Sequence, residues 1–406
     1  MTLVVTLAAA GAGGAGVSAV GGKGASLGEL ARAGVAVPPG FVVTVEAFAA
    51  AMAAIDPSGA RRAEVEALPA ADLAAIAAAA ARFRTLVAGA PLPDEVAAAI
   101  EAGYAALGEG PALDGARNET APDVAVRSSA TVEDSAEASF AGLQDTYLGV
   151  SGATSVLDHV RRCWASLYND ESVAYRRRLG LPEAGVAMAV VVQRMVAPRA
   201  AGVMFTRSPV TGDRSVVAVE GVWGLGSALV SGDVTPDSWI ISKITGEISS
   251  RRISPKFKIH SYLPNGSAAP PSTPPVALGG QDATTGSSRK APGHDVERPA
   301  SLAAGESGAA ARVTVRDTPP DLRDSPCLTD DEIRALASVA RRVEAHYGAP
   351  QDIEWAVLDG TENADARIVL LQSRPETVWA SREIPPAGAP KPRAADHVLA
   401  LFGKPL

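Results

Sequence analysis

The sequence has 406 residues and a formal net charge of −8 at pH 7, with 37 basic side chains against 45 acidic ones. That length allows a large core, which we expect to divide into two or three packed units. Nucleic acids and anionic membranes both bind basic faces, so the acidic chain predicts neither as a partner. Cys163 and Cys327 stand far apart in no CxxC arrangement, which predicts two unpaired thiols and a cytoplasmic location.

The first hundred residues combine a short apolar run, many glycines and an Ala-rich stretch. Val4–Ala10 predicts a first strand, and the glycines after it satisfy GxGxxG. A dinucleotide site is not favoured, because no acidic residue closes a second strand about 20 residues later. A helix is expected over Ala25–Ala33 with Gly34 as its C-cap. Helical spacing over residues 45–107, broken at two Pro-containing turns, predicts a helical portion.

Strand-like runs return after this portion, and they mix with further helices. A helix is expected over Ala153–Leu179, and Thr329–Glu332 is a capping-box sequence that opens another helix ending near Tyr347. The mixture predicts an α/β or an α+β domain. The predicted strands are Asp123–Arg127, Ala187–Gln193, Ala201–Thr206, Ser215–Glu220, Trp239–Ser242, Asp352–Leu358 and Arg367–Gln372.

Two segments in the second half of the chain depart from this pattern. Residues 264–312 are rich in Pro, Ser, Gly, Ala and Thr and have almost no large apolar side chains. Such a composition cannot bury enough apolar surface to fold, so it predicts a disordered or loosely attached insertion. After Trp379 the chain becomes Pro-rich and basic, which is typical of a linker.

Two glycine- or hydroxyl-rich motifs are suited to phosphate. The segment GGKGASLGEL places Lys23 among glycines before a helix, whose first N–H groups favour anions. It lacks the spacing of a Walker A loop, and a solvated lysine on a glycine turn would explain it as well. In VRSSATVED, Arg127 ends a predicted strand and hydroxyl residues follow it. A polar hairpin with an exposed ion pair is the alternative there.

A third motif is suited to a metal ion. On adjacent strands, Asp352 and Glu354 would share one face of a sheet, and so would Gln372 and Arg374. Carboxylate and amide oxygens beside a guanidinium would suit Mg²⁺ and phosphate. Alternating polar residues on a solvated face would give the same pattern.

Six blocks of sequence occur in one order along residues 21–380: GGKGASLGEL with VPPGFVVT, VAVRSSATVEDSAEASFAGLQDTYLGV, VVVQRMVAPRAAGVMFTRSPVTGD, VEGVWGLGSALVSGDVTPDSW, QDIEWAV and VLLQSRPET. They resemble the N-terminal ATP-binding domain of the phosphoenolpyruvate synthase and pyruvate phosphate dikinase family. As a stand-alone chain, the protein is similar to the small ATP-binding subunit of phenylphosphate synthase. The resemblance implies an ATP-grasp fold of the α+β class, with a Gly-rich N-terminal subdomain and an Ala-rich helical portion.

Five regions follow from this resemblance together with the composition. We expect an N-terminal subdomain with the helical portion over 1–120, a central ATP-grasp region over 121–260 and a low-complexity insertion over 261–320. A C-terminal part with the Mg²⁺ and phosphate residues would cover 321–380, and a linker-like tail 381–406.

The resemblance also implies roles for single residues. Lys23 and Arg127 match residues that bind ATP phosphates, and Gly142 lies in a segment similar to the family's phosphate-covering loop. Glu354 and Gln372 match the Mg²⁺ ligands. Gln193, Met195 and Val196 match residues that line the adenine pocket, and Glu220 matches an acid near the ribose. Asp352 would bind nucleotide beside the metal. Arg374 matches a catalytic arginine that stabilises charge together with Lys23 and Arg127.

The histidine that carries the phosphoryl group in this family has no match here. None of His159, His260, His294, His346 and His397 lies in a segment like that of the carrier. We therefore expect the ATP-binding subunit of a split enzyme that uses ATP and Mg²⁺ to phosphorylate a histidine on a separate carrier subunit. The products would be AMP and phosphate, and the final acceptor pyruvate, a phenol or another hydroxyl compound. The alternatives are a non-catalytic nucleotide-binding module and an isolated domain of a longer enzyme of the phosphoenolpyruvate synthase or rifampin phosphotransferase type.

Overall fold

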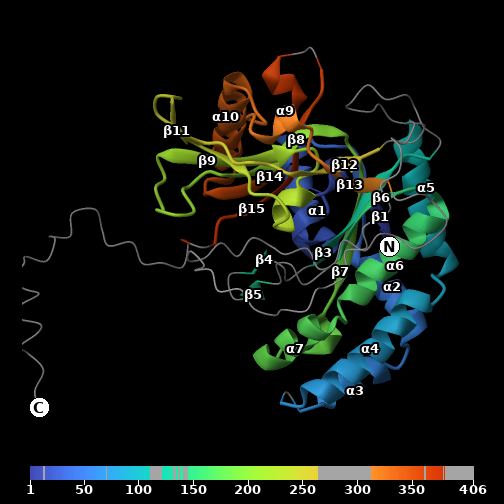
Figure 1. Cartoon of the computed structure of the whole chain (residues 1–406). Coiled ribbons are helices and arrows are strands. Elements are labelled where there is room, and N and C mark those ends of the chain that lie inside the picture. The colour runs from blue at the N-terminus through green and yellow to red at the C-terminus, as the bar shows by residue number, and fades with distance from the viewer. Residues whose placement is uncertain are drawn as a thin grey trace, which may run out of the picture.

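The computed structural model describes residues 1–11, 14–69, 71–109, 121–130, 134–135, 138–139, 145–263, 312–360, 363–377 and 379. Its main features are two antiparallel sheets, each with helices packed on it (Figure 1). In both sheets every pair of neighbouring named strands is antiparallel, and helix α1 contacts both sheets. This arrangement confirms the α+β class and removes the α/β alternative, which would need a parallel sheet.

The smaller sheet has five strands in the order β1-β2-β7-β3-β6. The predicted first strand is shorter than expected, because Leu7–Ala9 form the 3-10 helix η1 and Leu7 turns into the core. The strand bounds are β1 Val4–Thr6, β2 Gly40–Val43, β3 Val124–Ala130, β6 Thr146–Val150 and β7 Met188–Arg194.

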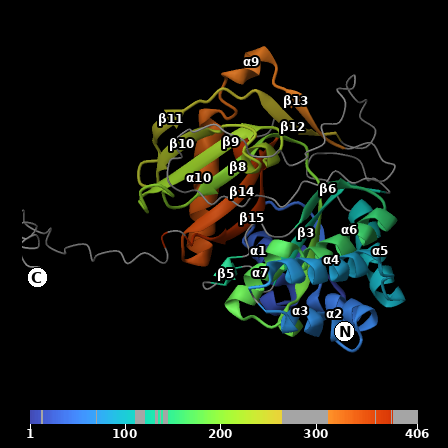
Figure 2. The ribbon, with the colours of Figure 1, turned by 60° about the horizontal axis from the view of Figure 1, so that its bottom comes forward.

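A layer of Ala-rich helices covers one face of the smaller sheet, and Figure 2 shows these helices together on one side of the molecule. The predicted helix over Ala153–Leu179 is two helices. Its break follows Ser166, where Tyr168 leaves the helix to pack its buried ring at 4.3 Å from that of Phe83. The layer consists of α2 Val45–Ile55, α3 Ala60–Ala67, α4 Leu73–Gly89, α5 Asp94–Glu109, α6 Ala153–Ser166 and α7 Asp170–Leu179, followed by the short η2 Glu183–Gly185.

Helix α1, Val17–Arg32, covers the opposite face of the smaller sheet. It begins earlier than the sequence predicted and contains a break at Gly21, whose φ is 67°. A positive φ is accessible to glycine at little cost. At the other end, Gly34 has φ 71° directly after the helix, as expected of a glycine C-cap.

The larger sheet has six strands in the order β11-β10-β9-β8-β14-β15. Helix α10, Asp330–Tyr347, packs on one face over the buried rings of Trp239 and Trp355. The predicted capping box at Thr329 and Glu332 is present. The strand bounds are β8 Pro198–Phe205, β9 Val216–Trp223, β10 Asp237–Ser242, β11 Ile248–Arg252, β14 Gln351–Leu358 and β15 Ile368–Pro375, with η3 Ala364–Arg367 before the last.

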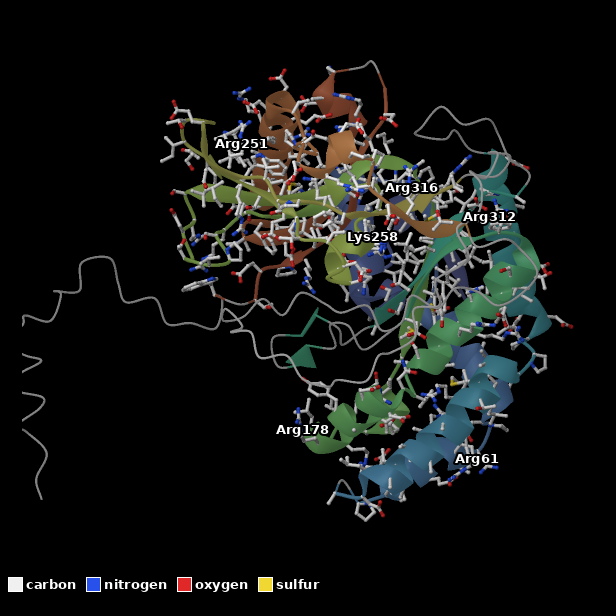
Figure 3. All side chains as sticks on the ribbon, viewed as in Figure 1. Arg61, Arg178, Arg251, Lys258, Arg312 and Arg316 are labelled. Carbon is white, nitrogen blue, oxygen red and sulfur yellow. The ribbon has the colours of Figure 1, made fainter. Side chains whose placement is uncertain are left out.

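A separate hairpin ties the two halves together. Its strands are β12 Lys258–Tyr262 and β13 Val313–Asp317. Asp123, which directly precedes β3, accepts hydrogen bonds from Tyr262 at 2.7 Å and Arg312 at 3.0 Å. Figure 3 shows Arg312 beside this hairpin, far from Arg61 and Arg178 at the other end of the helical layer. The short elements are α8 Ser227–Val230, α9 Pro320–Arg323, β4 Asp134–Ser135 and β5 Ala138–Ser139.

Most of the predicted insertion, residues 264–311, lies outside the described part of the chain, and so does most of the predicted tail. Strand β13 falls within the expected 261–320 region. The five regions stay a prediction.

Over the described residues, no single helix has the length and apolar character to cross a membrane, although the bent pair Leu73–Gly89 and Asp94–Glu109 together meet those two criteria.

Candidate functional site

A cavity of about 180 Å³ lies between strands β8, β14 and β15 of the larger sheet and strands β3 and β7 of the smaller one. Most of its lining is apolar, with a few charged and amide groups among the apolar side chains, which is typical of a small-molecule site. Of the residues that the sequence assigned to a site, seven line this cavity: Lys23, Arg127, Gln193, Met195, Val196, Glu354 and Gln372.

Arg127 lies at the centre of the contact between the sheets. On β3, Val124 and Val126 point into the core under the helical layer, so Arg127 points to the opposite face. Its Nη2 donates to Oε1 of Gln372 at 2.7 Å and to Oε2 of Glu354 at 3.1 Å. Its Nη1 donates to the carbonyl of Leu371 at 2.7 Å. One guanidinium therefore joins the smaller sheet to β14 and β15 through charge-assisted hydrogen bonds.

The register between β14 and β15 brings the predicted metal ligands together. Glu354 lies opposite Gln372, and Asp352 lies opposite Arg374. Opposite residues on an antiparallel pair point to the same face, so a carboxylate and an amide oxygen lie side by side, both facing Arg127. Arg374 instead forms two contacts with Oδ2 of Asp352, at 2.9 and 2.8 Å, and these two residues are not among those lining the cavity.

These oxygen donors fit Mg²⁺, which is usually held by one or two side-chain oxygens together with phosphate oxygens and water. Within the described ranges, no group of three or more His, Cys, Asp or Glu side chains could hold a metal ion. One carboxylate and one amide leave most of the coordination positions of Mg²⁺ to phosphate oxygens and water, so the donor set is suited to a metal that arrives with a phosphate ligand.

Lys23 reaches the cavity because of the break in α1. The break at Gly21 brings the helix backbone against β3, where a Cβ on Gly21 would lie 2.0 Å from the carbonyl oxygen of Ser129. The buried Ser129 hydroxyl donates to the carbonyl of Val20 at 2.8 Å and accepts from the N–H of Gly24 at 3.1 Å. Ser129 thus bonds to both sides of the break, two residues along β3 from Arg127. Lys23 is buried, with 8% of its surface exposed.

The motif VRSSATVED predicts phosphate contacts for the hydroxyl residues that follow Arg127. In the structure the hydroxyl of Ser129 instead bonds to the backbone of α1. Alternation along the strand places Ser129 on the same face as Arg127, but its partner follows from the break at Gly21, which the sequence does not predict.

The end of β7 and the residues after it form another wall of the cavity. Met195 is buried and contacts Ala125 and Leu225, while its N–H donates to the carbonyl of Asp123 at 2.9 Å. Val196 packs in a separate small cluster next to it. Gln193 lines the cavity, and its amide donates to the carbonyl of Pro38 at 3.2 Å. Apart from Gln193, this wall is apolar, which suits contact with a planar base.

Two of the predicted residues remain to be placed. Glu220 on β9 lies opposite Val203, which in turn lies opposite Glu354, so Glu220 continues the same row across the sheet. It is partly exposed and not among the residues that line the cavity. Gly142 lies outside the described residues.

The two thiols are free and buried, as expected. Burial raises the pKa of Cys163 and of Cys327 well above the ordinary value, which keeps both as neutral thiols. Neither has the low-pKa environment of a nucleophilic cysteine.

A lysine and an arginine beside a carboxylate and an amide, next to an apolar wall, are suited to a phosphorylated ligand. The sequence comparisons agree with this class. Residues 17–275 and 294–392 match the family model described as pyruvate phosphate dikinase, AMP/ATP-binding domain. Since the match covers most of the chain, the protein belongs to this family.

Curated relatives include enzymes of two kinds. Rifampicin phosphotransferase from a Streptomyces species is 42% identical over 367 residues, which is 89% of this chain and 35% of the relative. Phosphoenolpyruvate synthase from Aeropyrum pernix is 39% identical over 90% of this chain and 41% of the relative. A probable phosphoenolpyruvate synthase from Methanothermobacter thermautotrophicus is 37% identical over 89% of this chain and 44% of the relative. The chain thus spans well under half the length of each.

Proposed function

We propose that the protein is the ATP-binding part of a dikinase-type phosphotransferase, and that two sheets closing on the cavity form an ATP-grasp site. It would use ATP and Mg²⁺ to phosphorylate a histidine on a separate carrier subunit, giving AMP and phosphate, and the phosphoryl group would then pass to pyruvate, a phenol or another hydroxyl compound. The observation that carries the proposal is the contact of Arg127 with both Glu354 and Gln372 in a cavity also lined by Lys23.

Phosphoryl transfer depends mainly on positioning and on neutralising negative charge, and both can come from fixed cations. Lys23 and Arg127 supply cationic donors from the smaller sheet and α1. Arg127 is already oriented by the oxygens of Glu354, Gln372 and Leu371, so it needs little reorganisation when phosphate replaces one of them. Bound Mg²⁺, held by Glu354 and Gln372, would supply further charge neutralisation.

The other implied roles are proposals of the same account. Met195, Val196 and Gln193 would face the adenine, and Glu220 the ribose. Arg374, held by Asp352 on the strand pair that also carries the metal ligands, would stabilise charge at the outer end of the phosphates. Gly142 would belong to the segment that covers them.

A carrier histidine outside the matched region is supported by the positions of the histidines within the described residues. His159 is bonded to Ser155 inside α6, His260 is buried, and His346 lies 3.4 Å from Glu29 on the outer side of α1 and α10. None of these three lines the cavity. The relatives extend well beyond the matched region, which supports the carrier and the acceptor site lying outside it.

The test is AMP formation from ATP by the purified chain, with and without a candidate carrier protein that contains a phosphorylatable histidine. We expect little AMP from the chain alone and rapid AMP formation with the carrier, together with phosphohistidine on the carrier. Rapid AMP formation by the chain alone would contradict the need for a carrier. Absence of ATP binding would contradict the whole proposal.

A further inference from the structure

A serine at the wall of the cavity and two polar side chains behind it contact one another in a row. None of the three has a role in the ATP site proposed above. Ser227, the first residue of α8, lines the cavity. Its Oγ lies 2.9 Å from Nδ1 of His260, on the β12 strand of the separate hairpin. On the other side of the imidazole, Nε2 lies 3.2 Å from Oδ2 of Asp233.

The backbone fixes His260 in this position. The N–H of Leu225 donates to the carbonyl of His260 at 2.8 Å. Gly224 makes this approach possible, because it has φ 71° and a Cβ there would lie 2.3 Å from the same carbonyl oxygen. His260 has 1% of its surface exposed. Burial lowers the pKa of His260, so its ring is neutral near pH 7.

A neutral imidazole carries one proton, and its surroundings decide where that proton lies. A carboxylate oxygen of Asp233 lies 3.2 Å from Nε2, in a direction that does not meet hydrogen-bond geometry, and its negative charge favours the proton on Nε2. Nδ1 is then an acceptor, and the hydroxyl of Ser227 donates to it. The hydrogen of Ser227 is therefore engaged behind the cavity, and the lone pairs of its oxygen are left for a ligand.

This polarity selects the part of the nucleotide that Ser227 can bind. Phosphate oxygens are acceptors, so an acceptor facing them would be unfavourable. The hydroxyl groups of a ribose can donate. Leu225, two residues before Ser227, packs on Met195 of the proposed base wall, whereas Arg127 and Glu354 lie at the phosphate end. Position and polarity thus both favour the sugar.

We propose, building on the proposed ATP site, that Ser227 accepts a hydrogen bond from one ribose hydroxyl of the nucleotide, with His260 as the positioning residue that fixes its direction. This contact would be additional to the one proposed for Glu220. Ser227 and Glu220 could then each accept a hydrogen bond from one of the two ribose hydroxyls. The protein would then distinguish ribonucleotides from deoxynucleotides partly through a side chain outside its phosphate motifs.

The test is calorimetric binding of ATP, 2′-deoxy-ATP and 3′-deoxy-ATP in EDTA, so that no turnover occurs. A neutral hydrogen bond changes affinity by about threefold to tenfold. We expect the unmodified protein to prefer ATP over one of the two analogues by at least this factor. Ser227→Ala should abolish that preference by weakening ATP binding to the level of the analogue, while the affinity for the analogue stays unchanged. Ser227→Thr retains a hydroxyl and should retain the preference.

Ser249→Ala is the control. Ser249 is an exposed serine on β11 that donates to the carbonyl of Ile240 at 3.1 Å, and it neither lines the cavity nor contacts His260 or Asp233. It should leave all three affinities unchanged. An identical preference in the unmodified protein and in Ser227→Ala would overturn the inference while leaving the ATP site intact. A protein that binds none of the three nucleotides would overturn the proposed function itself. If Ser227→Ala lowers the thermal midpoint by more than a few degrees, Ser227→Cys is measured in its place. A thiol has a similar shape but is a weaker acceptor, so Ser227→Cys should likewise lose the preference for ATP over the analogue.

Discussion

Arg127 donates from Nη2 to Oε2 of Glu354 across 3.1 Å, and this contact joins two strands that are 227 residues apart in sequence. The guanidinium is only 11% exposed, whereas the carboxylate is 31% exposed. The cation thus lies deeper than its partner, and Glu354 is the more accessible of the two groups to an incoming ligand. Removing Arg127 should therefore weaken the binding of the nucleotide itself, whereas removing Glu354 should weaken the effect of Mg²⁺ on that binding.

Glu354→Ala should remove the dependence of ATP affinity on Mg²⁺, because it deletes the carboxylate of the proposed metal pair. In the unmodified protein we expect ATP to bind at least tenfold more tightly with Mg²⁺ than in EDTA. In the variant, the two affinities should agree within about threefold, a difference of under 1 kcal/mol. Calorimetric titrations with and without Mg²⁺ measure this directly.

Asp359→Ala is the control for that experiment. Asp359 directly follows β14 and is 81% exposed, so it removes one negative charge without touching the cavity. A full Mg²⁺ effect in Glu354→Ala, or an equal loss in Asp359→Ala, would contradict the assignment of Glu354.

Gly21→Ala should destabilise the fold more than Gly34→Ala. Both glycines lie at positive φ in or next to α1, and holding an alanine in such sparsely populated backbone regions costs about 1–3 kcal/mol. At Gly34 nothing lies within 4 Å of the new Cβ, so only this cost applies. At Gly21 the Cβ would lie 2.0 Å from the Ser129 carbonyl oxygen, so α1 must move away from β3 and take Lys23 with it.

Urea unfolding of the two variants measures the difference, and ATP affinity measures the displacement of Lys23. Gly21→Ala should lose more unfolding free energy than Gly34→Ala. Only Gly21→Ala should bind ATP more weakly than the unmodified protein. Equal losses in the two variants would be inconsistent with the close approach to β3.

Stability should fall as pH is lowered from 7.5 to 5.5. Burial lowers the pKa of His159 and of His260 below the ordinary 6.5, so the unfolded chain binds protons that the folded chain does not. With more protons on the unfolded state, the free energy of unfolding rises with pH between the folded and the unfolded pKa values. Each histidine contributes this slope until pH drops below its folded pKa.

The measurement is urea unfolding at several pH values for the unmodified protein and for His159→Phe, which replaces an imidazole that packs on the ring of Tyr147 with another aromatic ring. We expect a smaller pH dependence of the unfolding free energy between pH 5.5 and 7.5 in the variant, because one of the two histidines has been removed. An unchanged slope would show that His159 does not contribute.

Arg176→Met should lower stability without weakening ATP binding. Arg176 and Glu183 form a pair at 2.8 Å with 1% and 0% exposure, between α7 and η2 in the helical layer. Removing one partner of a buried pair leaves the other charge uncompensated and costs about 3–5 kcal/mol. A thermal midpoint well below that of the unmodified protein, with unchanged ATP affinity at 10 °C, is the expected pattern.

The double variant Arg176→Met with Glu183→Leu should recover most of the loss, since no charge is then left buried. Further destabilisation in the double variant would argue against this pair as the cause.

Period-two alternation predicted the geometry of β14 and β15, because it depends only on the strand itself. The sequence predicted that Asp352 and Glu354 share a face of one strand and that Gln372 and Arg374 share a face of an adjacent strand, and the register of β14 and β15 brings all four to the same face. It could not show that Arg374 pairs with Asp352 outside the cavity, or that Arg127 takes the inner pair. The first contact depends on the register of β14 and β15, and the second on how the two sheets pack, and no local pattern encodes either.

The same distinction applies to the contacts of α1 and α8. The glycines before Lys23 indicated an unusual backbone, but the break at Gly21 and its bonding to Ser129 follow from the approach of α1 to β3. The contacts of Ser227 with His260 join a short helix to a hairpin whose second strand follows a long low-complexity segment. Their positions in sequence carry no motif, so only the tertiary arrangement brings them together.

The most direct test of the ATP site is the affinity for ATP in EDTA of the unmodified protein, Arg127→Ala and Arg316→Ala. Arg316 is an exposed arginine on β13, labelled in Figure 3, and it bonds to Ser261 outside the cavity. Loss of a charge-assisted contact to phosphate weakens binding by about tenfold or more, so Arg127→Ala should lose at least this much while Arg316→Ala and the circular dichroism of both variants stay unchanged. An Arg127→Ala variant that is folded and binds ATP as tightly as the unmodified protein would contradict the account.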